Sequence, residues 1–374
     1  MKFATTLFVF CIAALLMLGM VMLYSSSMTQ VGPRYLVMQL IWCVFGLGAC
    51  ATMAVLDYRH LKRCAWVLFG AALLMLALVL VPHVGTKVNG ARRWIALGPA
   101  RFQPSEFAKL ALVIALAAYI ERNQRQMPAI KRGLLIPGAI IVAIVGLVFV
   151  EPDRGTSILL SAVGGMMLVV AGVKLRVIVP PAIVAVLGLA YSLWHDPMRM
   201  KRIFSWLYLE ENKEGVGYQA YQAMLALGSG GWSGLGLGNG RQKLGFLPEH
   251  HTDFIFSIIG EELGLFATVG VVLLFVMLVA CGLYIAWHSR DAFGFYLGCG
   301  VTFLIGLQAF INIGVVTSAL PNKGLPLPFI SYGGSSLLMM LTAVGLLLSV
   351  ARRGVAATAK SKNPFGEKEV IPAT

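Results

Sequence analysis

The sequence predicts an all-α polytopic membrane protein with about ten transmembrane helices. Of its 374 residues, 58% are hydrophobic and only 12% are charged, and the mean hydropathy is +0.81. A soluble domain carries roughly 25% charged residues, so the composition excludes a soluble globule. Apolar runs long enough to span a bilayer, or nearly so, recur along the chain. They cover residues 3–24, 35–56, 65–82, 105–120, 134–150, 156–173, 177–194, 254–286, 293–316 and 335–351.

The first and the eighth apolar runs differ from an ordinary membrane span. Run 3–24 has about 20 residues and no A-x-A-like cleavage site, so we expect a retained helix instead of a signal peptide. Run 254–286 would be about 50 Å long as one helix, and it must therefore tilt, break or project from the membrane. Between the seventh and eighth runs, the polar segment 195–252 predicts a large outer loop.

The whole chain before its polar end predicts a single membrane domain. Residues 1–353 form this domain, and residues 354–374, which are polar and mixed in charge, predict a disordered cytoplasmic tail. The six cysteines lie in apolar runs or at the edge of one, and no Cys-x-x-Cys occurs. We therefore expect neither a disulfide framework nor a dedicated metal site.

The distribution of basic residues predicts the orientation. An even number of spans puts both termini on one side, and we expect that side to be the cytoplasm. Sixteen of the 30 Lys and Arg residues then lie in the short inner connections and the two ends, as the positive-inside rule requires. Ten of the other fourteen lie in the outer segments 83–103 and 195–252. Anchoring to anionic headgroups is the simplest explanation of a net charge of +14, but an outer excess of cations also suits an anionic ligand.

Asp253 is the strongest candidate for a catalytic residue. It ends the polar sequence Glu249-His250-His251-Thr252-Asp253 and directly precedes an apolar run. Partial burial at a membrane–water boundary disfavours the charged form of a carboxylate and suits it to accept a proton. A base beside cationic loops indicates chemistry on an anionic, lipid-borne substrate.

Four other acidic residues and one lysine stand at the ends of predicted spans. Glu106 and Lys109 are three residues apart on one helical face, either as a structural ion pair or as residues that position substrate. Asp153 lies in a tight outer turn, where a substrate role and a structural role are both open. Glu261 and Glu262 point in directions about 100° apart, and anchoring of a neighbouring helix is favoured slightly over a proton pathway.

Several of these segments together resemble one family. They are Phe102-Gln103-Pro104-Ser105-Glu106, Glu151-Pro152-Asp153, Gly155-Thr156, His251-Thr252-Asp253-Phe254-Ile255-Phe256, Gly260-Glu261-Glu262-Leu263-Gly264 and Pro326-Leu327-Pro328-Phe329-Ile330-Ser331-Tyr332-Gly333-Gly334-Ser335-Ser336. In this order they resemble the SEDS (shape, elongation, division and sporulation) family of bacterial ten-helix peptidoglycan glycosyltransferases. Lys323-Gly324 before Leu-Pro-Leu-Pro is more similar to the division branch than to the elongation branch.

The resemblance implies that the chain polymerises lipid II into glycan strands on the outer face of the cytoplasmic membrane during cell division. Asp253 would take the proton from the acceptor hydroxyl, with inversion and with undecaprenyl pyrophosphate leaving. The diphosphate is already a good leaving group, so one base can suffice where a glycosidase needs two carboxylates. We expect substrate contacts from Arg92, Arg93, Glu106, Lys109, Asp153, Arg199, Lys201, Arg202, Lys243, Lys323 and Ser331, and a structural polar role for Glu261 and Glu262.

The resemblance also implies partners. These are a class B penicillin-binding protein acting as transpeptidase and the divisome proteins; no nucleic acid is expected. The cofactor is unknown, and a divalent cation, Mg²⁺ or Mn²⁺, at the pyrophosphate is left open. The alternatives are an elongation-type polymerase, a lipid II transporter or flippase, and a non-catalytic divisome scaffold. A transporter usually shows internal repeats, which the sequence lacks, and a scaffold would not need Asp253.

Overall fold

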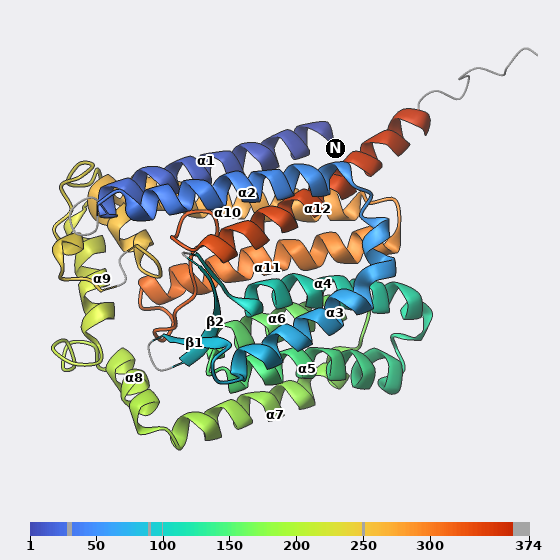
Figure 1. Ribbon diagram of the computed structural model, residues 1–374, viewed down its shortest axis with the longest axis horizontal. Coiled ribbons are helices and arrows are strands. Elements are labelled where there is room, and N and C mark those ends of the chain that lie inside the picture. Colours follow the sequence, from blue (N-terminus) through green and yellow to red (C-terminus); the bar gives the residue numbers. More distant parts are fainter. Residues whose placement is uncertain (28–31, 89–90, 99, 249–250, 362–374) are drawn as a thin grey trace, which may run out of the picture.

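The computed structural model describes residues 1–361 except 28–31, 89–90, 99 and 249–250. It is a bundle of helices with a small sheet at one end (Figure 1). The bundle consists of α1 (Lys2–Ser27), α2 (Arg34–Val55), α3 (Arg59–Leu80), α4 (Pro104–Asn123), α5 (Ile136–Val150), α6 (Arg154–Val170), α7 (Leu175–Trp194), α10 (Ile255–Trp287), α11 (Ala292–Val316) and α12 (Gly334–Ser361). The remaining elements are β1 (Gly85–Val88), β2 (Ala91–Leu97), β3 (Ala100–Phe102), η1 (Gln124–Gln126), η2 (Lys131–Leu135), α8 (Pro197–Leu207), α9 (Tyr218–Ser229) and η3 (Gln242–Leu244).

The helices confirm a multi-pass, all-α membrane protein. Within the described residues, eight helices are long and apolar enough to cross a membrane. Of the other two bundle helices, α6 is shorter and α4 carries Glu106 and Lys109 near its start. The ten bundle helices overlap the ten predicted runs, whereas their division into ten crossings stays a prediction. Helix α12 continues to Ser361, beyond the predicted start of the tail at residue 354.

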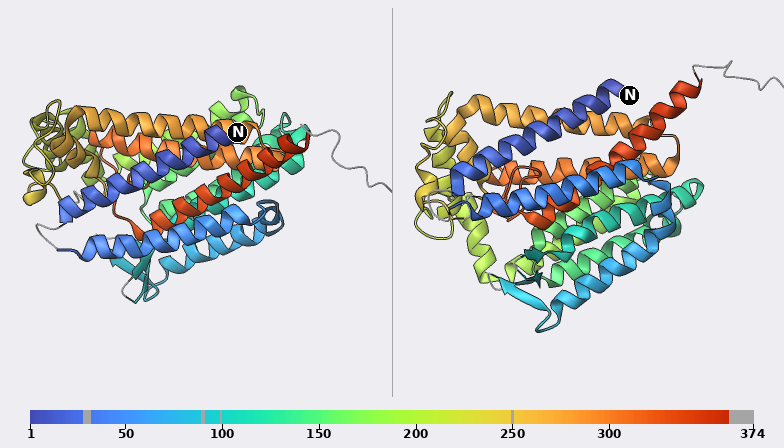
Figure 2. Two further views of the ribbon diagram at one scale, coloured as in Figure 1. Left: turned by 90° about the horizontal axis from the view of Figure 1, so that it is seen from above. Right: turned by 45° about the horizontal axis from the view of Figure 1, so that its top comes forward.

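The two ends of the bundle differ in composition. The sheet, α8 and α9 lie at one end, which we call the cavity end, and the N-terminus and the end of α12 lie at the other (Figure 1, Figure 2). At that other end, three ion pairs join residues in the helix ends and in the connections between helices. These are Arg59–Asp291, Lys62–Glu121 and Arg353–Asp57. The start of α1 and the described end of α12 therefore lie at the same end of the bundle, while the number of crossings stays a prediction.

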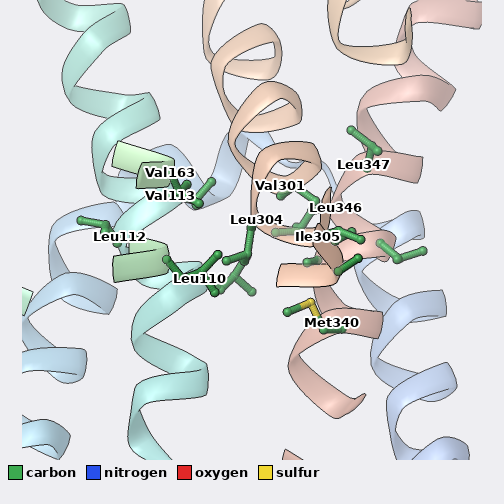
Figure 3. Packing of buried hydrophobic residues seen from close by; sticks show 14 of the residues in the cluster. Leu110, Leu112, Val113, Val163, Val301, Leu304, Ile305, Met340, Leu346 and Leu347 are labelled. Carbon is green, nitrogen blue, oxygen red and sulfur yellow. The ribbon is translucent and has the colours of Figure 1, made fainter. Parts of the chain in front are cut away.

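Helices α4 and α11 form the centre of the bundle. Figure 3 shows side chains of α4, α6, α11 and α12 meeting there, among them Val113, Val163 and Leu304. Lipid tails are as apolar as these side chains, so close packing, not removal from water, holds the helices together. A Cβ on Gly300 of α11 would lie 2.6 Å from Val113 Cγ1 of α4, which shows how closely the two helices approach.

The sheet at the cavity end was not predicted, because residues 83–103 read only as a basic loop. Strands β1, β2 and β3 are antiparallel in that order, with Thr86 opposite Trp94 and Ala96 opposite Arg101. Successive side chains of a strand point to opposite faces. Strand β2 therefore sends Arg92 and Arg93 in opposite directions, and only one of them can face the bundle.

Helix α10 breaks at Gly264, which confirms that its apolar run is too long for one straight helix. The backbone of Gly264 has φ 77° and ψ −172°, in a region that favours glycine. The glycine-rich segment 230–240 fills the break. Leu235 N donates to Glu261 O at 3.0 Å, and Leu265 N donates to Gly231 O at 2.9 Å. Backbone groups of α10 that have no partner within the helix at the break are thus hydrogen-bonded by this segment.

Replacing Gly264 by Ala should destabilise the fold by about 2–4 kcal/mol, because alanine is strained at this φ and its Cβ would meet a neighbouring chain segment. That Cβ would lie 2.3 Å from Gly234 N. The matched control is Gly270→Ala in the same helix, where an added Cβ meets nothing within 4 Å. Thermal unfolding of the purified proteins in detergent measures both, and equal midpoints for the two variants would contradict this account of the break.

Candidate functional site

A cavity of about 750 Å³ opens at the cavity end of the bundle. It lies between the sheet, the starts of α2, α4 and α6, and the segment 324–336 that leads into α12. Six charged residues line it: Arg34, Arg93, Arg101, Glu106, Asp153 and Asp253. The candidate base and three of the predicted substrate residues, Arg93, Glu106 and Asp153, thus line one cavity.

Asp253 is half-buried at the wall of this cavity, two residues before α10 begins. Its carboxylate lies directly over Gly324, where a Cβ would be 2.5 Å from Asp253 Oδ2. Asn312 of α11 fixes the backbone: its Nδ2 donates to Asp253 O at 2.8 Å and to Leu325 O at 2.7 Å. One buried amide therefore holds both segments that form this wall.

Glu106 and Lys109 form a buried ion pair at the start of α4. Lys109 Nζ lies 2.8 Å from Glu106 Oε2, and the two side chains are 1% and 3% exposed. Lys109 Nζ also donates to Gln308 Oε1 at 2.9 Å, and Gln308 Nε2 donates to Pro326 O at 2.9 Å. Glu106 lines the cavity, whereas Lys109 reaches the same loop as Asn312 through Gln308.

The carboxylate of Asp153 caps the N-terminus of helix α6. It accepts hydrogen bonds from Thr156 N at 3.1 Å, Thr156 Oγ1 at 3.0 Å and Gln103 Nε2 at 3.3 Å. Arg93 binds the same turn, donating from Nε to Glu151 O at 3.0 Å and from a terminal nitrogen to the Pro152 carbonyl at 2.6 Å. The turn is thereby tied to the sheet.

Glu151 lies in this turn, outside both helices, and is fully buried. Burial, and the nearby Asp153 carboxylate, raise the pKa of Glu151 to about 8, while Arg93 acts in the opposite direction. Among the described residues, neither carboxylate oxygen has a hydrogen-bond partner. Burial therefore favours the protonated, neutral form of Glu151 at neutral pH.

Lys243 and Ser331, two of the predicted substrate ligands, are buried in internal contacts and do not line the cavity. Lys243 Nζ lies 2.6 Å from Glu262 Oε1 and donates to Ser25 Oγ at 2.8 Å. Ser331 Oγ accepts from Leu327 N at 2.8 Å. Glu262 also accepts from Ser25 Oγ at 2.7 Å, so Lys243 and Glu262 join the outer loop to α1 and α10.

Glu261 has a comparable structural position. Its carboxylate accepts from Arg241 N at 2.8 Å and from Gln242 N at 3.2 Å. The side chains of Glu261 and Glu262 are 1% and 0% exposed. Both glutamates therefore bind the loop that precedes η3, which is the kind of anchoring that the sequence slightly favoured for them.

The other predicted cations do not belong to the residues that line the cavity. Arg92 is on β2, and Lys201 and Arg202 are exposed on α8. The side chain of Arg199 lies outside the described residues. Lys323 precedes Gly324; burial, and then the neighbouring Arg154, lower the pKa of Lys323. Substrate contact by these residues stays a prediction.

Four residues that the sequence did not single out belong to the site. Arg34, the first residue of α2, and Arg101 of β3 line the cavity. Gln308 and Asn312 hold its loop from α11. Arg101 lies two residues before the helix-start signal Gln103-Pro104, which could have marked it. The two amides are four residues apart within an apolar run, a spacing that puts them on one helical face.

A metal ion is not indicated by the protein side chains. Across the described part of the chain, no group of three or more His, Cys, Asp or Glu residues could hold one. Of the cavity acids, Glu106 is paired with Lys109 and Asp153 caps α6. A divalent cation bound mainly through phosphates of a substrate stays a prediction.

Comparison with known proteins identifies the relatives of this chain. A family model for FtsW, RodA and SpoVE, described as cell cycle protein, matches residues 5–355. A probable peptidoglycan glycosyltransferase FtsW from Trichlorobacter lovleyi is 41% identical over 347 residues, which are 91% of this chain and 91% of that protein. Stage V sporulation protein E from Bacillus subtilis is 37% identical over 344 residues, covering 90% and 94%.

Solved structures are similar along nearly the whole chain. One, described as structural coordination of polymerization and crosslinking by a peptidoglycan synthase complex, has a chain with a TM-score of 0.79 and 31% identity, covering 93% of this chain and 97% of that one. The rod shape determining protein RodA of Thermus thermophilus gives a TM-score of 0.70 and 31% identity, with 96% and 97% covered.

Glu151 should make stability depend on pH. A carboxyl group has a pKa of 4.5 when unperturbed and about 8 in this fold. Between these values the folded state binds more protons than the unfolded state, so stability falls as pH rises. Each pH unit in that window costs up to about 1.4 kcal/mol.

The variant Glu151→Gln should flatten this dependence, because its neutral amide does not titrate. Thermal midpoints measured from pH 5 to pH 8 should fall less in the variant than in the wild type. Glu211→Gln, which changes an exposed carboxylate in the loop after α8, should keep the wild-type slope. Parallel curves for wild type and Glu151→Gln would show that Glu151 is not buried as a neutral acid.

Proposed function

The chain belongs to the FtsW/RodA/SpoVE family of cell cycle proteins, and we propose that its cavity is the catalytic centre, with Asp253 as the base. It is a peptidoglycan glycosyltransferase, as its relatives are named. The proposed reaction joins two molecules of lipid II, a disaccharide-pentapeptide carried on undecaprenyl pyrophosphate. The acceptor hydroxyl attacks the anomeric carbon of the donor, its proton passes to Asp253, and undecaprenyl pyrophosphate leaves.

One observation carries this proposal: the Asp253 carboxylate lies at the wall of a cavity that three arginines also line. A base must reach the proton that it takes, and a cavity at the end of a membrane bundle admits both the sugar and the lipid. The negative charge that grows on the leaving diphosphate needs fixed positive groups nearby. Arg34, Arg93 and Arg101 meet this need from three different elements.

The surrounding structure keeps the base in place. Asp253 is held through its carbonyl by Asn312 and lies against Gly324. Both contacts are made by buried or backbone atoms, so the carboxylate is preorganised before substrate binds. Small displacements of a reacting group cost large factors in rate, and such support is therefore part of the catalytic apparatus.

The location and partners follow from the same assignment. The cavity end would face the outside of the cytoplasmic membrane, and the end that carries the termini and the three ion pairs would face the cytoplasm. The similar peptidoglycan synthase complex couples polymerization to crosslinking. A crosslinking partner for this chain would be a class B penicillin-binding protein, together with divisome proteins. A division role agrees with 41% identity to an FtsW protein, against 31% to the RodA chain.

Replacing Asp253 by Asn should lower polymerisation at least about 100-fold, because the amide cannot take the proton. The measurement is a gel of glycan products from labelled lipid II, with purified protein alone and with its transpeptidase partner. The thermal midpoint of the variant should match that of the wild type. Product of wild-type length and amount from the variant would remove Asp253 as the base, and a wild type that binds lipid II without extending it would point to a transporter or scaffold.

Gly324→Ala should also lower the rate, by about 10- to 100-fold, since a shift of the base by 1 Å can cost this much. The added Cβ would meet Asp253 Oδ2 at 2.5 Å and push the carboxylate away. Gly215→Ala is the matched control: its added Cβ meets only Asn212 O, at 3.9 Å, in a loop that does not line the cavity. Equal polymerisation rates for the two variants would show that Asp253 is not held against Gly324.

A further inference from the structure

The start of α12 forms part of the cavity wall. Gly334, Ser335 and Ser336, its first three residues, all line the cavity. The first backbone N–H groups of a helix have no partner within the helix, and the helix dipole places positive charge there. The N-terminus of a helix thereby favours an anion such as a phosphate.

The cap of α12 differs from those of two other helices. Asp153 caps α6 and Asp291 caps α11, each with a carboxylate that accepts a backbone N–H. The residue before α12 is Gly333, which has no side chain and whose own N–H donates to Gln39 Oε1 at 3.2 Å. Within the described residues, no acceptor is recorded for the N–H groups of the first three residues of α12. This helix start has no side-chain cap, as is also true of α2 and α4 beside the same cavity, whereas the starts of α6 and α11 are occupied.

Ser335 gives a second, independent indication of a ligand. The residue is only 2% exposed and lines the cavity, and no hydrogen bond from its hydroxyl to a described residue is recorded. Its oxygen is not one of the fully buried side-chain atoms that lack a partner, so it is open to the cavity. A hydroxyl that is shielded from bulk water and open to a cavity can make its hydrogen bond to a ligand there. Ser336, the next residue of the same turn, lines it as well.

Two arginines add charge at the same place. Both Arg34 and Arg101 act electrostatically on Tyr332, which lies two residues before α12, and β3 packs against α12. Among the described residues, neither guanidinium has an ion pair or a hydrogen bond. Arg93, the third arginine, already donates to two backbone carbonyls. Arg34 and Arg101 are thus the cavity cations with donors to spare.

We propose that the first turn of α12, with Ser335 and Ser336, together with Arg34 and Arg101, is the subsite that binds the diphosphate of the lipid-linked substrate. This inference rests on the proposed function and adds the location of the leaving group. Met38 and Trp42 follow Arg34 at intervals of four on α2 and also line the cavity. They give the subsite an apolar flank, on which the first isoprene units of the lipid lie.

The test measures binding, so that it does not depend on turnover. The full-length protein in nanodiscs is titrated with undecaprenyl pyrophosphate and with uncharged undecaprenol. The double variant Arg34→Gln/Arg101→Gln should bind the pyrophosphate at least about tenfold more weakly, and Ser335→Ala/Ser336→Ala several-fold more weakly, because charged hydrogen bonds are lost. Undecaprenol should bind all proteins alike.

The control variant removes the same charge elsewhere. Lys87→Gln/Lys213→Gln changes two exposed lysines at the cavity end that do not line the cavity, and it should bind undecaprenyl pyrophosphate as the wild type does. Inorganic pyrophosphate should displace the lipid from the wild type, with lower affinity than the lipid. If it binds at the arginines and serines while the lipid binds independently of them, the site is one for free diphosphate and the proposal is wrong.

The outcomes separate this inference from the proposed function. If the wild type polymerises lipid II while the arginine and serine variants keep wild-type binding and KM, the subsite is wrong and the function stands. If undecaprenyl pyrophosphate binding depends on these residues but the wild type forms no glycan, the function is wrong and the subsite stands. A conservative variant, Arg34→Lys/Arg101→Lys, should recover part of the binding, which a merely misfolded site would not show.

Discussion

The side-chain amide of Asn312 is the interaction on which the site depends. Its two N–H groups bind Asp253 O and Leu325 O, so a single buried residue joins the segment before α10 to the loop before α12. Both segments are irregular, and irregular backbone at the end of a membrane bundle has to find its hydrogen-bond partners within the protein. Gln308, one turn earlier on α11, holds Pro326 O in the same way. The rigid central helix thus carries the base indirectly, through backbone carbonyls.

The charged residues around the site fall into two groups with different consequences. Lys109 with Glu106, and Lys243 with Glu262, are ion pairs almost without exposure, and each has further hydrogen bonds. Removing one partner of such a pair leaves a charge uncompensated, and so these pairs fix the positions of the segments that they join. Arg34 and Arg101 have no such partner among the described residues and face the cavity. A cation contributes to binding only where the fold has not already neutralised it.

The difference between cations that are paired within the fold and cations that face the cavity also explains how far the sequence could predict the site. Hydropathy located the bundle helices, and the position of Asp253 before an apolar run marked the cavity wall. Counting cations in loops could not distinguish Lys243, which is buried against Glu262, from Arg101, which lines the cavity. The strands of residues 85–102 are short and basic, with no clear alternation, and the sheet that places Arg93 and Arg101 was therefore missed. Gln308 and Asn312 were hidden inside an apolar run, because their role depends on segments distant in sequence.

Two of the helix starts at the cavity, those of α6 and α12, differ in the charge beside them. At α6 the N-terminus is occupied by Asp153, so an anionic group would meet a carboxylate there, whereas at α12 the N-terminus is open and has arginines beside it. A carboxylate base and a departing diphosphate repel each other, and the repulsion is strong where water is excluded. Tyr332 N donates to His251 O at 3.0 Å, so the segment that carries Asp253 lies beside the segment that leads into α12. The positive groups of the proposed subsite would offset this repulsion, because they lie on the same cavity as the base.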